Sequence, residues 1–187
     1  ASGAFLIAMG ALVDPGDEWL MPDPCYPCNR HFVRMFEGVA KTIESGPERH
    51  YQLDREDVAR HWSERTRGVM LASPSNPTGT VVPGRALEEI VAEVRARHGH
   101  TLVDEIYQGL TYGGPHHPTA LGLGEDLFVV NSFSKYFNMT GWRLGWLVLP
   151  PTLVPAVEKL AQNLYICASS IAQHAARACF EPASLAE

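Results

Sequence analysis

One lysine lies among side chains suited to binding a small charged ligand. It is Lys135, in the segment SFSKYFNMTGWRLGW at residues 132–146, with serines before it, aromatic residues after it and Arg143 further on. The chain has only two other lysines, Lys41 and Lys159, and neither has comparable neighbours, so both are interpreted as surface charges. An amine in such surroundings is a candidate nucleophile toward a carbonyl group.

Three more polar side chains follow short apolar runs. Asn76 lies in SPSNPTG after the run at 68–72, Asp104 and Tyr107 lie in DEIY after the run at 101–103, and Lys135 follows the run at 127–131. In an open parallel sheet with right-handed crossovers, ligands bind outside the carboxyl ends of the strands. We therefore expect these four side chains to converge on one edge of a sheet.

The elements that must position them alternate between apolar runs and stretches of helical period, which is typical of an α/β fold. Because the apolar runs are nearly continuous, they predict a three-layer α/β/α arrangement with a mostly parallel sheet covered on both faces. The strands are expected at 18–22, 39–44, 67–73, 101–105, 127–132 and 143–149. The helices are expected at 3–12, 29–38, 53–62 and from Pro83 to Gly99, with one or two more after Pro151.

Composition and charge narrow the class of protein. The 187 residues include 15 basic and 21 acidic side chains, and the resulting charge of −6 argues against nucleic acid or an anionic membrane as the partner. Four scattered cysteines favour the reducing cytoplasm over a disulfide scaffold. The opening segment AFLIAMGALV is too short to span a bilayer and lacks a basic leader, so it is interpreted as a buried helix. The start within that helix suggests a fragment or a trimmed product.

Pyridoxal 5′-phosphate would use all of these groups. Lys135 can form a Schiff base with its aldehyde, and Asp104 can keep the ring nitrogen protonated, which makes the ring an electron sink. Asn76 and Tyr107 can donate to the ring oxygen. The phosphate can bind hydroxyls, a guanidinium and the free N–H groups of a helix start. The phosphate candidates are Ser132, Ser134, Arg143 and the turn at Ala1, Ser2 and Gly3.

Five segments in order, DPGDE, DPCYP, SPSNPTG, VDEIY and SFSKYFNMTGWRLGW, resemble the class I/II aminotransferases of the aspartate aminotransferase superfamily, the fold-type I pyridoxal-phosphate enzymes. The resemblance implies the large cofactor-binding domain of such an enzyme, and transamination between an amino acid and a 2-oxo acid. It implies that Lys135 forms the Schiff base and moves the proton, and that Tyr26 stacks on the cofactor ring. The remaining implied cofactor ligands are Ser2, Gly3, Asn76, Asp104, Tyr107, Ser132, Ser134 and Arg143, with Tyr107 and Asp104 also counted as catalytic.

The same resemblance implies a division of the chain and a partner. Residues 1–150 would form the cofactor-binding core, and residues 151–187 would lead toward a smaller C-terminal domain that this chain does not contain. The arginine that binds the substrate carboxylate is expected outside the chain. Members of the family build their site at a homodimer interface, so a homodimer is expected here.

Other functions remain open at this stage. A carbon–sulfur β-lyase could use the same lysine, aspartate and tyrosine, and the effector domain of a transcriptional regulator or a silent fragment could keep the same fold. Cys25 and Cys28 form a lone C-x-x-C group with His31 three residues later, but no second pair has the spacing of a structural zinc site, so no metal is expected.

Overall fold

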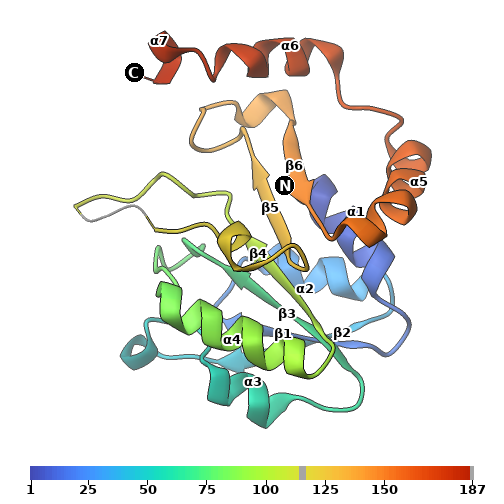
Figure 1. Cartoon of the computed structure of the whole chain (residues 1–187), viewed down its shortest axis with the longest axis vertical. Coiled ribbons are helices and arrows are strands. Elements are labelled where there is room, and N and C mark those ends of the chain that lie inside the picture. Colours follow the sequence, from blue (N-terminus) through green and yellow to red (C-terminus); the bar gives the residue numbers. More distant parts are fainter. Residues whose placement is uncertain (114–116, 186–187) are drawn as a thin grey trace.

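A six-stranded sheet forms the middle of the molecule in a computed structural model that describes residues 1–113 and 117–185. Its strand order is β2-β1-β3-β4-β5-β6. The strands are β1 (Glu18–Asp23), β2 (Val39–Glu44), β3 (Thr66–Ala72), β4 (His100–Asp104), β5 (Phe128–Ser132) and β6 (Gly145–Val148). Figure 1 shows helices on either side of this sheet, so the predicted α/β class with three layers is confirmed.

The helices and short 3₁₀ turns fill the connections between strands. The α-helices are α1 (Ser2–Leu12), α2 (Pro27–Arg34), α3 (Arg55–His61), α4 (Gly84–Ala96), α5 (Val154–Leu164), α6 (Ser170–Ala178) and α7 (Pro182–Leu185). The 3₁₀ turns are Pro47–Arg49, Ala120–Leu123, Thr140–Trp142 and Pro151–Leu153. No helix in the described part of the chain is both long enough and apolar enough to cross a membrane.

Alternating strand residues supply two separate cores, one on each face of the sheet. Leu71 and Val103 face α3 and α4, whereas Met70 and Leu102 face α1 and α2. Successive strand side chains point to opposite faces, and these strands have both faces covered, so nearly every position in them is apolar. This alternation decides below which side chains can reach the ligand pocket.

One edge strand of the sheet runs opposite to the others. The strands from β2 to β5 pair in parallel, but β6 runs antiparallel to β5, with Ser132 opposite Gly145. The strand expected at 143–149 is thus present, and it is the antiparallel member of the mostly parallel sheet that the sequence predicts. The connection at 133–144 holds no helix long enough for a crossover, and parallel strands need one, so the chain returns beside β5 in the opposite direction.

Local signals set the helix limits. Helix α2 begins at Pro27, two residues before the predicted start, because proline tolerates the first helical position, where no hydrogen bond from its nitrogen is needed. It ends before the predicted 38, and Glu37 has a φ of 60°. Helix α3 begins at Arg55, inside the predicted range 53–62, because the side chain of Asp54 caps it by accepting from the backbone N–H of Asp57 at 2.8 Å.

Lys41 is not the surface charge that its surroundings in the sequence suggested. Its Nζ donates to Glu18 Oε2 at 3.2 Å and to the carbonyl of His61 at 2.7 Å. The side chain of Glu18 is buried and also accepts from the Ser63 hydroxyl at 2.7 Å. Lys41 therefore neutralises a buried carboxylate near the amino ends of the strands.

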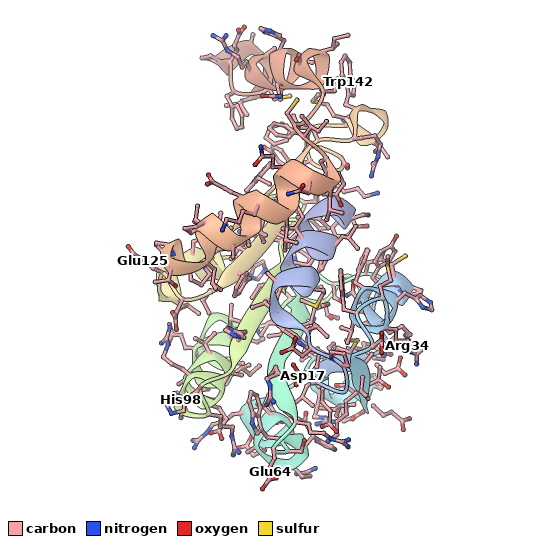
Figure 2. All side chains as sticks on the ribbon, turned by 90° about the vertical axis from the view of Figure 1, so that its right-hand side faces the viewer. Asp17, Arg34, Glu64, His98, Glu125 and Trp142 are labelled. Atoms are coloured by element: carbon pink, nitrogen blue, oxygen red, sulfur yellow. The ribbon has the colours of Figure 1, made fainter. Side chains whose placement is uncertain are left out.

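The C-terminal segment has two parts with different surroundings. Helix α5 packs on α1, and Val157 is its buried residue. Helix α6 instead packs Ala172 and Ala176 toward the turn after β5, where Ala176 contacts the cluster of Phe133 and Met139. Figures 1 and 2 both show α6 apart from the sheet. Between residues 151 and 185 the chain forms three α-helices, where one or two are predicted.

Candidate active site

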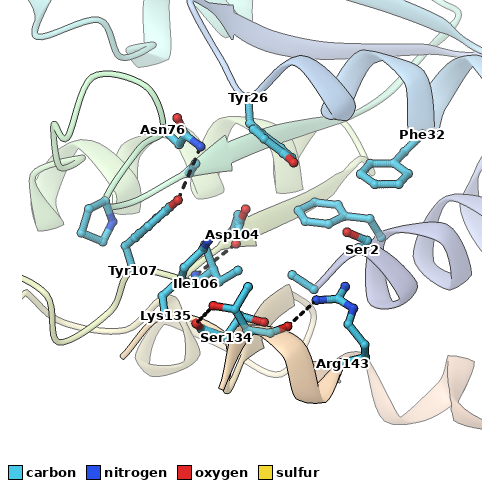
Figure 3. Close-up of a pocket in the computed structure, with 15 residues that line it drawn as sticks. Ser2, Tyr26, Phe32, Asn76, Asp104, Ile106, Tyr107, Ser134, Lys135 and Arg143 are labelled. Atoms are coloured by element: carbon cyan, nitrogen blue, oxygen red, sulfur yellow. Dashed lines mark hydrogen bonds between the residues drawn. The ribbon is translucent and has the colours of Figure 1, made fainter. Parts of the chain in front are cut away.

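A pocket of about 260 Å³ lies at the carboxyl ends of β3, β4 and β5. Figure 3 shows the aromatic rings of Tyr26 and Tyr107, the carboxylate of Asp104 and the guanidinium of Arg143 around it. Its lining combines one acid, two basic side chains, an amide, hydroxyls and aromatic rings. The lining residues are Ala1, Ser2, Phe5, Tyr26, Phe32, Ala72, Pro74, Asn76, Asp104, Ile106, Tyr107, Ser134, Lys135, Thr140 and Arg143.

Asp104 is the acid of this pocket. It ends β4, two residues after Leu102, and so belongs to the face that α1 and α2 cover. Its residue is 6% exposed, and Oδ1 accepts from the backbone N–H of Ile106 at 3.0 Å. Burial raises the pKa of Asp104 to about 6, although the Ile106 N–H opposes the shift. A cationic group beside it would stabilise its charged form.

Asn76 and Tyr107 reach the pocket from two different loops. Asn76 Nδ2 donates to the Tyr107 hydroxyl at 3.4 Å, as the dashed line in Figure 3 marks. The Asn76 loop is closed on itself by the Gly79 N–H, which donates to the Ser75 carbonyl at 2.8 Å. An amide and a phenol thus present two donors side by side at one wall of the pocket.

The turn between β5 and β6 carries both basic side chains. Lys135 Nζ lies 5.9 Å from the centroid of the Tyr107 ring. The Thr140 hydroxyl donates to the carbonyl of Ser134 at 2.6 Å, and Arg143 Nη1 donates to the carbonyl of Thr140 at 2.9 Å. The turn therefore holds the amine and the guanidinium in one local unit.

The starts of two helices complete the lining. Ser2 opens α1, and Tyr26 directly precedes Pro27 at the start of α2. Phe32 of α2 stacks on Phe5 of α1 with ring centroids 5.2 Å apart and planes 3° apart. The first turn of α1 has free backbone N–H groups, which favour an anion nearby.

Eight of the ten residues predicted for the site line the pocket. They are Ser2, Tyr26, Asn76, Asp104, Tyr107, Ser134, Lys135 and Arg143. Gly3 lies outside the lining, near the ring of Tyr165. Ser132 also lies outside it and is 1% exposed, and its Oγ accepts from the backbone N–H of Ser134 at 3.0 Å. Ser132 thus supports the turn from behind.

Sequence reasoning missed Phe32 and Thr140 as lining residues. Phe32 lies within the helix predicted at 29–38 and stacks on Phe5 of α1, but an apolar ring on a helix face covered by another helix gives no signal of a ligand pocket. Thr140 lies within the segment that was singled out, but only the turn geometry brings its hydroxyl to the pocket.

The cysteines form no disulfide, since all four are free. Cys25 is buried, and burial raises the pKa of its thiol. Contact with Cys28 raises the pKa of the Tyr26 phenol. Among residues 1–113 and 117–185, no group of three or more His, Cys, Asp or Glu side chains is arranged to bind a metal ion.

The chain matches the family model described as aminotransferase class I and II over residues 1–186. It is 41% identical to the valine–pyruvate aminotransferase of Mycobacterium tuberculosis, with 100% of this chain and 48% of that protein covered. It is 34% identical to the aspartate aminotransferase of Geobacillus stearothermophilus, with 96% and 47% covered. The chain belongs to the class I and II aminotransferase family.

Solved structures agree with this relationship. The crystal structure of an aminotransferase from Mycobacterium tuberculosis superposes with a TM-score of 0.94 at 41% identity, with 99% of this chain and 50% of that chain covered. The aromatic aminotransferase from Pyrococcus horikoshii OT3 gives a TM-score of 0.92 at 29% identity, with 98% and 50% covered. The chain spans about half the length of the relatives that it matches.

Proposed function

We propose that this chain is the cofactor-binding part of a pyridoxal-phosphate-dependent aminotransferase, which moves an amino group between an amino acid and a 2-oxo acid. The observation that carries the proposal is the convergence of Asp104, Lys135 and Arg143 in one pocket. An acid at the end of β4, together with an amine and a guanidinium on the turn after β5, matches a ligand with a basic ring nitrogen, an aldehyde and a phosphate.

The buried acid supplies the test of fit. Asp104 is almost enclosed, and in the protein itself burial favours its neutral form. A protonated ring nitrogen beside it would replace lost hydration and restore its charge. The residues that would hold the cofactor are Ser2, Tyr26, Asn76, Asp104, Tyr107, Ser134, Lys135 and Arg143, supported by Gly3 and Ser132.

When bound, the cofactor supplies a conjugated ring that accepts an electron pair from the α-carbon of the substrate. Lys135 would hold the aldehyde end through Nζ and afterwards carry the α-proton on the same nitrogen. Asn76 and Tyr107 would donate to the ring oxygen, and Tyr26 would cover one ring face. Arg143 and Ser134 would fix the phosphate, and charged donors of this kind contribute more than neutral hydroxyls.

Two earlier alternatives lose support. The relatives reported above carry aminotransferase names, which favours transamination over carbon–sulfur β-elimination and over an effector domain without activity. Product analysis distinguishes transamination from β-elimination. A requirement for a 2-oxo acid acceptor supports transamination, whereas release of pyruvate and ammonia from one amino acid indicates a lyase.

Lys135→Ala tests the proposal directly. The chain has three lysines, so Lys159→Ala on the exposed side of α5 is a matched control. Borohydride treatment of the cofactor-loaded protein, followed by peptide mass spectrometry, should find the cofactor attached at residue 135 in wild type and in the control. Attachment that persists in Lys135→Ala would refute the assignment.

The proposal extends to the whole protein. We place the cofactor-binding core at 1–150 and a helical link to a smaller domain at 151–187, and we assign the protein to the cytoplasm as a homodimer without nucleic acid or membrane partners. Four free cysteines and the charge of −6 support this assignment. Sedimentation of the cofactor-loaded protein at the mass of a monomer would contradict the homodimer.

A further inference from the structure

Glu105 is a buried carboxylate outside the pocket that follows directly after Asp104 in the chain. Its residue is 4% exposed, and it is absent from the lining of the pocket. Asp104 faces the side of α1 and α2. The next side chain points to the opposite face of the sheet, where Val103 and Ala120 belong to the core under α4. The side chains of Asp104 and Glu105, at the end of β4, therefore point to opposite faces of the sheet.

Each oxygen of the Glu105 carboxylate accepts a hydrogen bond from a residue at the end of the loop that begins at Ile106. Oε2 accepts from the Thr119 hydroxyl at 2.7 Å, and Oε1 accepts from the Ala120 N–H at 2.6 Å. These bonds fall on the two residues at which the chain re-enters the core, since Thr119 precedes the 3₁₀ turn Ala120–Leu123. The Glu105 side chain thereby joins the end of this loop to the residue that precedes its start at Ile106.

Tyr107 lies at the start of the same loop. Its carbonyl accepts from the Leu110 N–H at 3.0 Å, and the Glu105 carbonyl accepts from the Gln108 N–H at 2.8 Å. Gln108 Nε2 also donates to the carbonyl of His117 at 2.6 Å, and this hydrogen bond joins the first and last parts of the loop. These hydrogen bonds link the turn that carries Tyr107 to the residues at which the loop ends.

We propose that Glu105 is a positioning residue, which fixes the Tyr107 phenol beside the Asn76 amide by anchoring Thr119 and Ala120 on the opposite face of the sheet. The inference rests on the proposed function, because the pair that it positions is the one expected to donate to the ring oxygen. The buried hydrogen bond from the Ala120 N–H and the partly buried one from the Thr119 hydroxyl both end on a carboxylate, and together they are strong enough to hold such a segment. Their loss would leave the buried Ala120 donor unpaired.

The readout is the pH at which the absorbance of the bound cofactor changes. A donor to the ring oxygen stabilises its negative charge, so loss of that donor raises the pKa of the bound cofactor. Tyr107→Phe should shift the titration upward by about one pH unit or more. Glu105→Ala should produce a shift of the same sign and about the same size.

The double variant Glu105→Ala/Tyr107→Phe separates positioning from general damage. If Glu105 acts through Tyr107, the double variant should titrate like Tyr107→Phe alone, because the phenol is already absent. Glu105→Gln should restore the wild-type titration, since its amide oxygen can accept from Ala120 and its amide nitrogen can donate to the Thr119 hydroxyl. Thr119→Val should give a partial shift and serves if Glu105→Ala does not fold.

Glu18→Ala is the matched control. Glu18 is equally a buried, multiply bonded carboxylate, but it lies near the amino ends of the strands. Its variant should lower the unfolding temperature without moving the cofactor titration. An unshifted titration in both Glu105→Ala and Thr119→Val, an effect additive with Tyr107→Phe, or an equal shift in Glu18→Ala would each overturn the inference.

The two proposals fail in distinguishable ways. If wild type shows no absorbance from bound pyridoxal 5′-phosphate, the proposed function fails and this inference fails with it. If wild type binds the cofactor and Tyr107→Phe shifts its titration while the Glu105 and Thr119 variants do not, only this inference is wrong.

Discussion

At the scale of single residues, the pocket holds an acid in a place that disfavours its charge. Asp104 is nearly enclosed, and its carboxylate accepts one backbone N–H. A group in this position stores unfavourable free energy in the ligand-free protein that a bound cation can release. Asp104 therefore favours the binding of a cationic ring but lowers the stability of the ligand-free protein.

Asp104 should make the stability of the ligand-free protein fall with rising pH. Its pKa is about 6 in the folded protein against an ordinary 3.8, so the folded state binds the proton more tightly. The free energy of unfolding should drop between those two pH values, by up to about 3 kcal/mol. Urea unfolding from pH 3.5 to 7.5 measures this, and Asp104→Asn should flatten the drop.

Asp126→Asn is the control for that measurement. The Arg95 guanidinium lowers the pKa of Asp126, which is an exposed acid outside the pocket. Its replacement should leave the drop between pH 3.8 and 6 in place. A wild-type protein whose stability rises across this range, after correction with Asp104→Asn, would contradict the assignment.

Arg143 should distinguish ligands with and without a phosphate. Arg143→Gln should weaken binding of pyridoxal 5′-phosphate about 10- to 100-fold, because a charge-assisted hydrogen bond is lost, and should leave binding of pyridoxal nearly unchanged. Absorbance titrations with both ligands measure the difference. Arg177→Gln on exposed α6 should change neither affinity, and an equal loss for both ligands in Arg143→Gln would argue for misfolding instead.

At the scale of elements, the antiparallel pair of β5 and β6 supports the turn with both basic side chains. Gly145 stands opposite Ser132 in this pair. A Cβ on Gly145 would lie 2.7 Å from the carbonyl oxygen of Asn131 and 2.9 Å from Ser132 Cβ. Only a residue without a side chain lets the two strands approach this closely.

Gly145→Ala should therefore separate the strands and disturb the turn between them. We expect a loss of about 1–3 kcal/mol in the free energy of unfolding, together with weaker cofactor binding. Gly122→Ala is the matched control, because nothing lies within 4 Å of a Cβ built there. Denaturant unfolding and cofactor titration of both variants test this, and equal stability of the two would show that the strands can adjust.

Elements were easier to predict from the sequence than their directions. Continuous apolar runs such as the one ending at Asp104 revealed buried strands, and strand ends then brought Asn76, Asp104, Tyr107 and Lys135 to one edge. Hydropathy carries no direction, so it does not identify the strand beginning at Gly145 as the one that reverses. The contribution of Thr140 depends on turn geometry, which no period in the sequence encodes.

At the scale of the whole molecule, the elements differ in how much apolar surface they bury. The sheet has a core on each face, whereas α6 buries only Ala172 and Ala176. Segments with few buried apolar contacts open at low free energy. The C-terminal helices should therefore move more independently than the sheet in this chain.

Hydrogen exchange should reveal that difference. Backbone amides of α6 should exchange much faster than those of β3 and β4, because opening α6 exposes little core. Mass spectrometry of peptides from both regions measures the rates. Helix α5 is an internal comparison, since it packs on α1 and should show intermediate protection; α6 protection equal to that of β3 would contradict the expectation.

The return of the chain from Ser132 to Gly145 has a further consequence for how the pocket can change. Lys135 and Arg143 are both carried by one hairpin connection, whereas Asn76 lies in the loop after β3 and Asp104 ends β4. An insertion or deletion in that connection would displace both cations together, while each of the other walls can be remodelled alone. A change in the length of that connection thus alters the whole cationic side of the pocket, whereas a change in the loop after β3 or β4 alters one wall at a time.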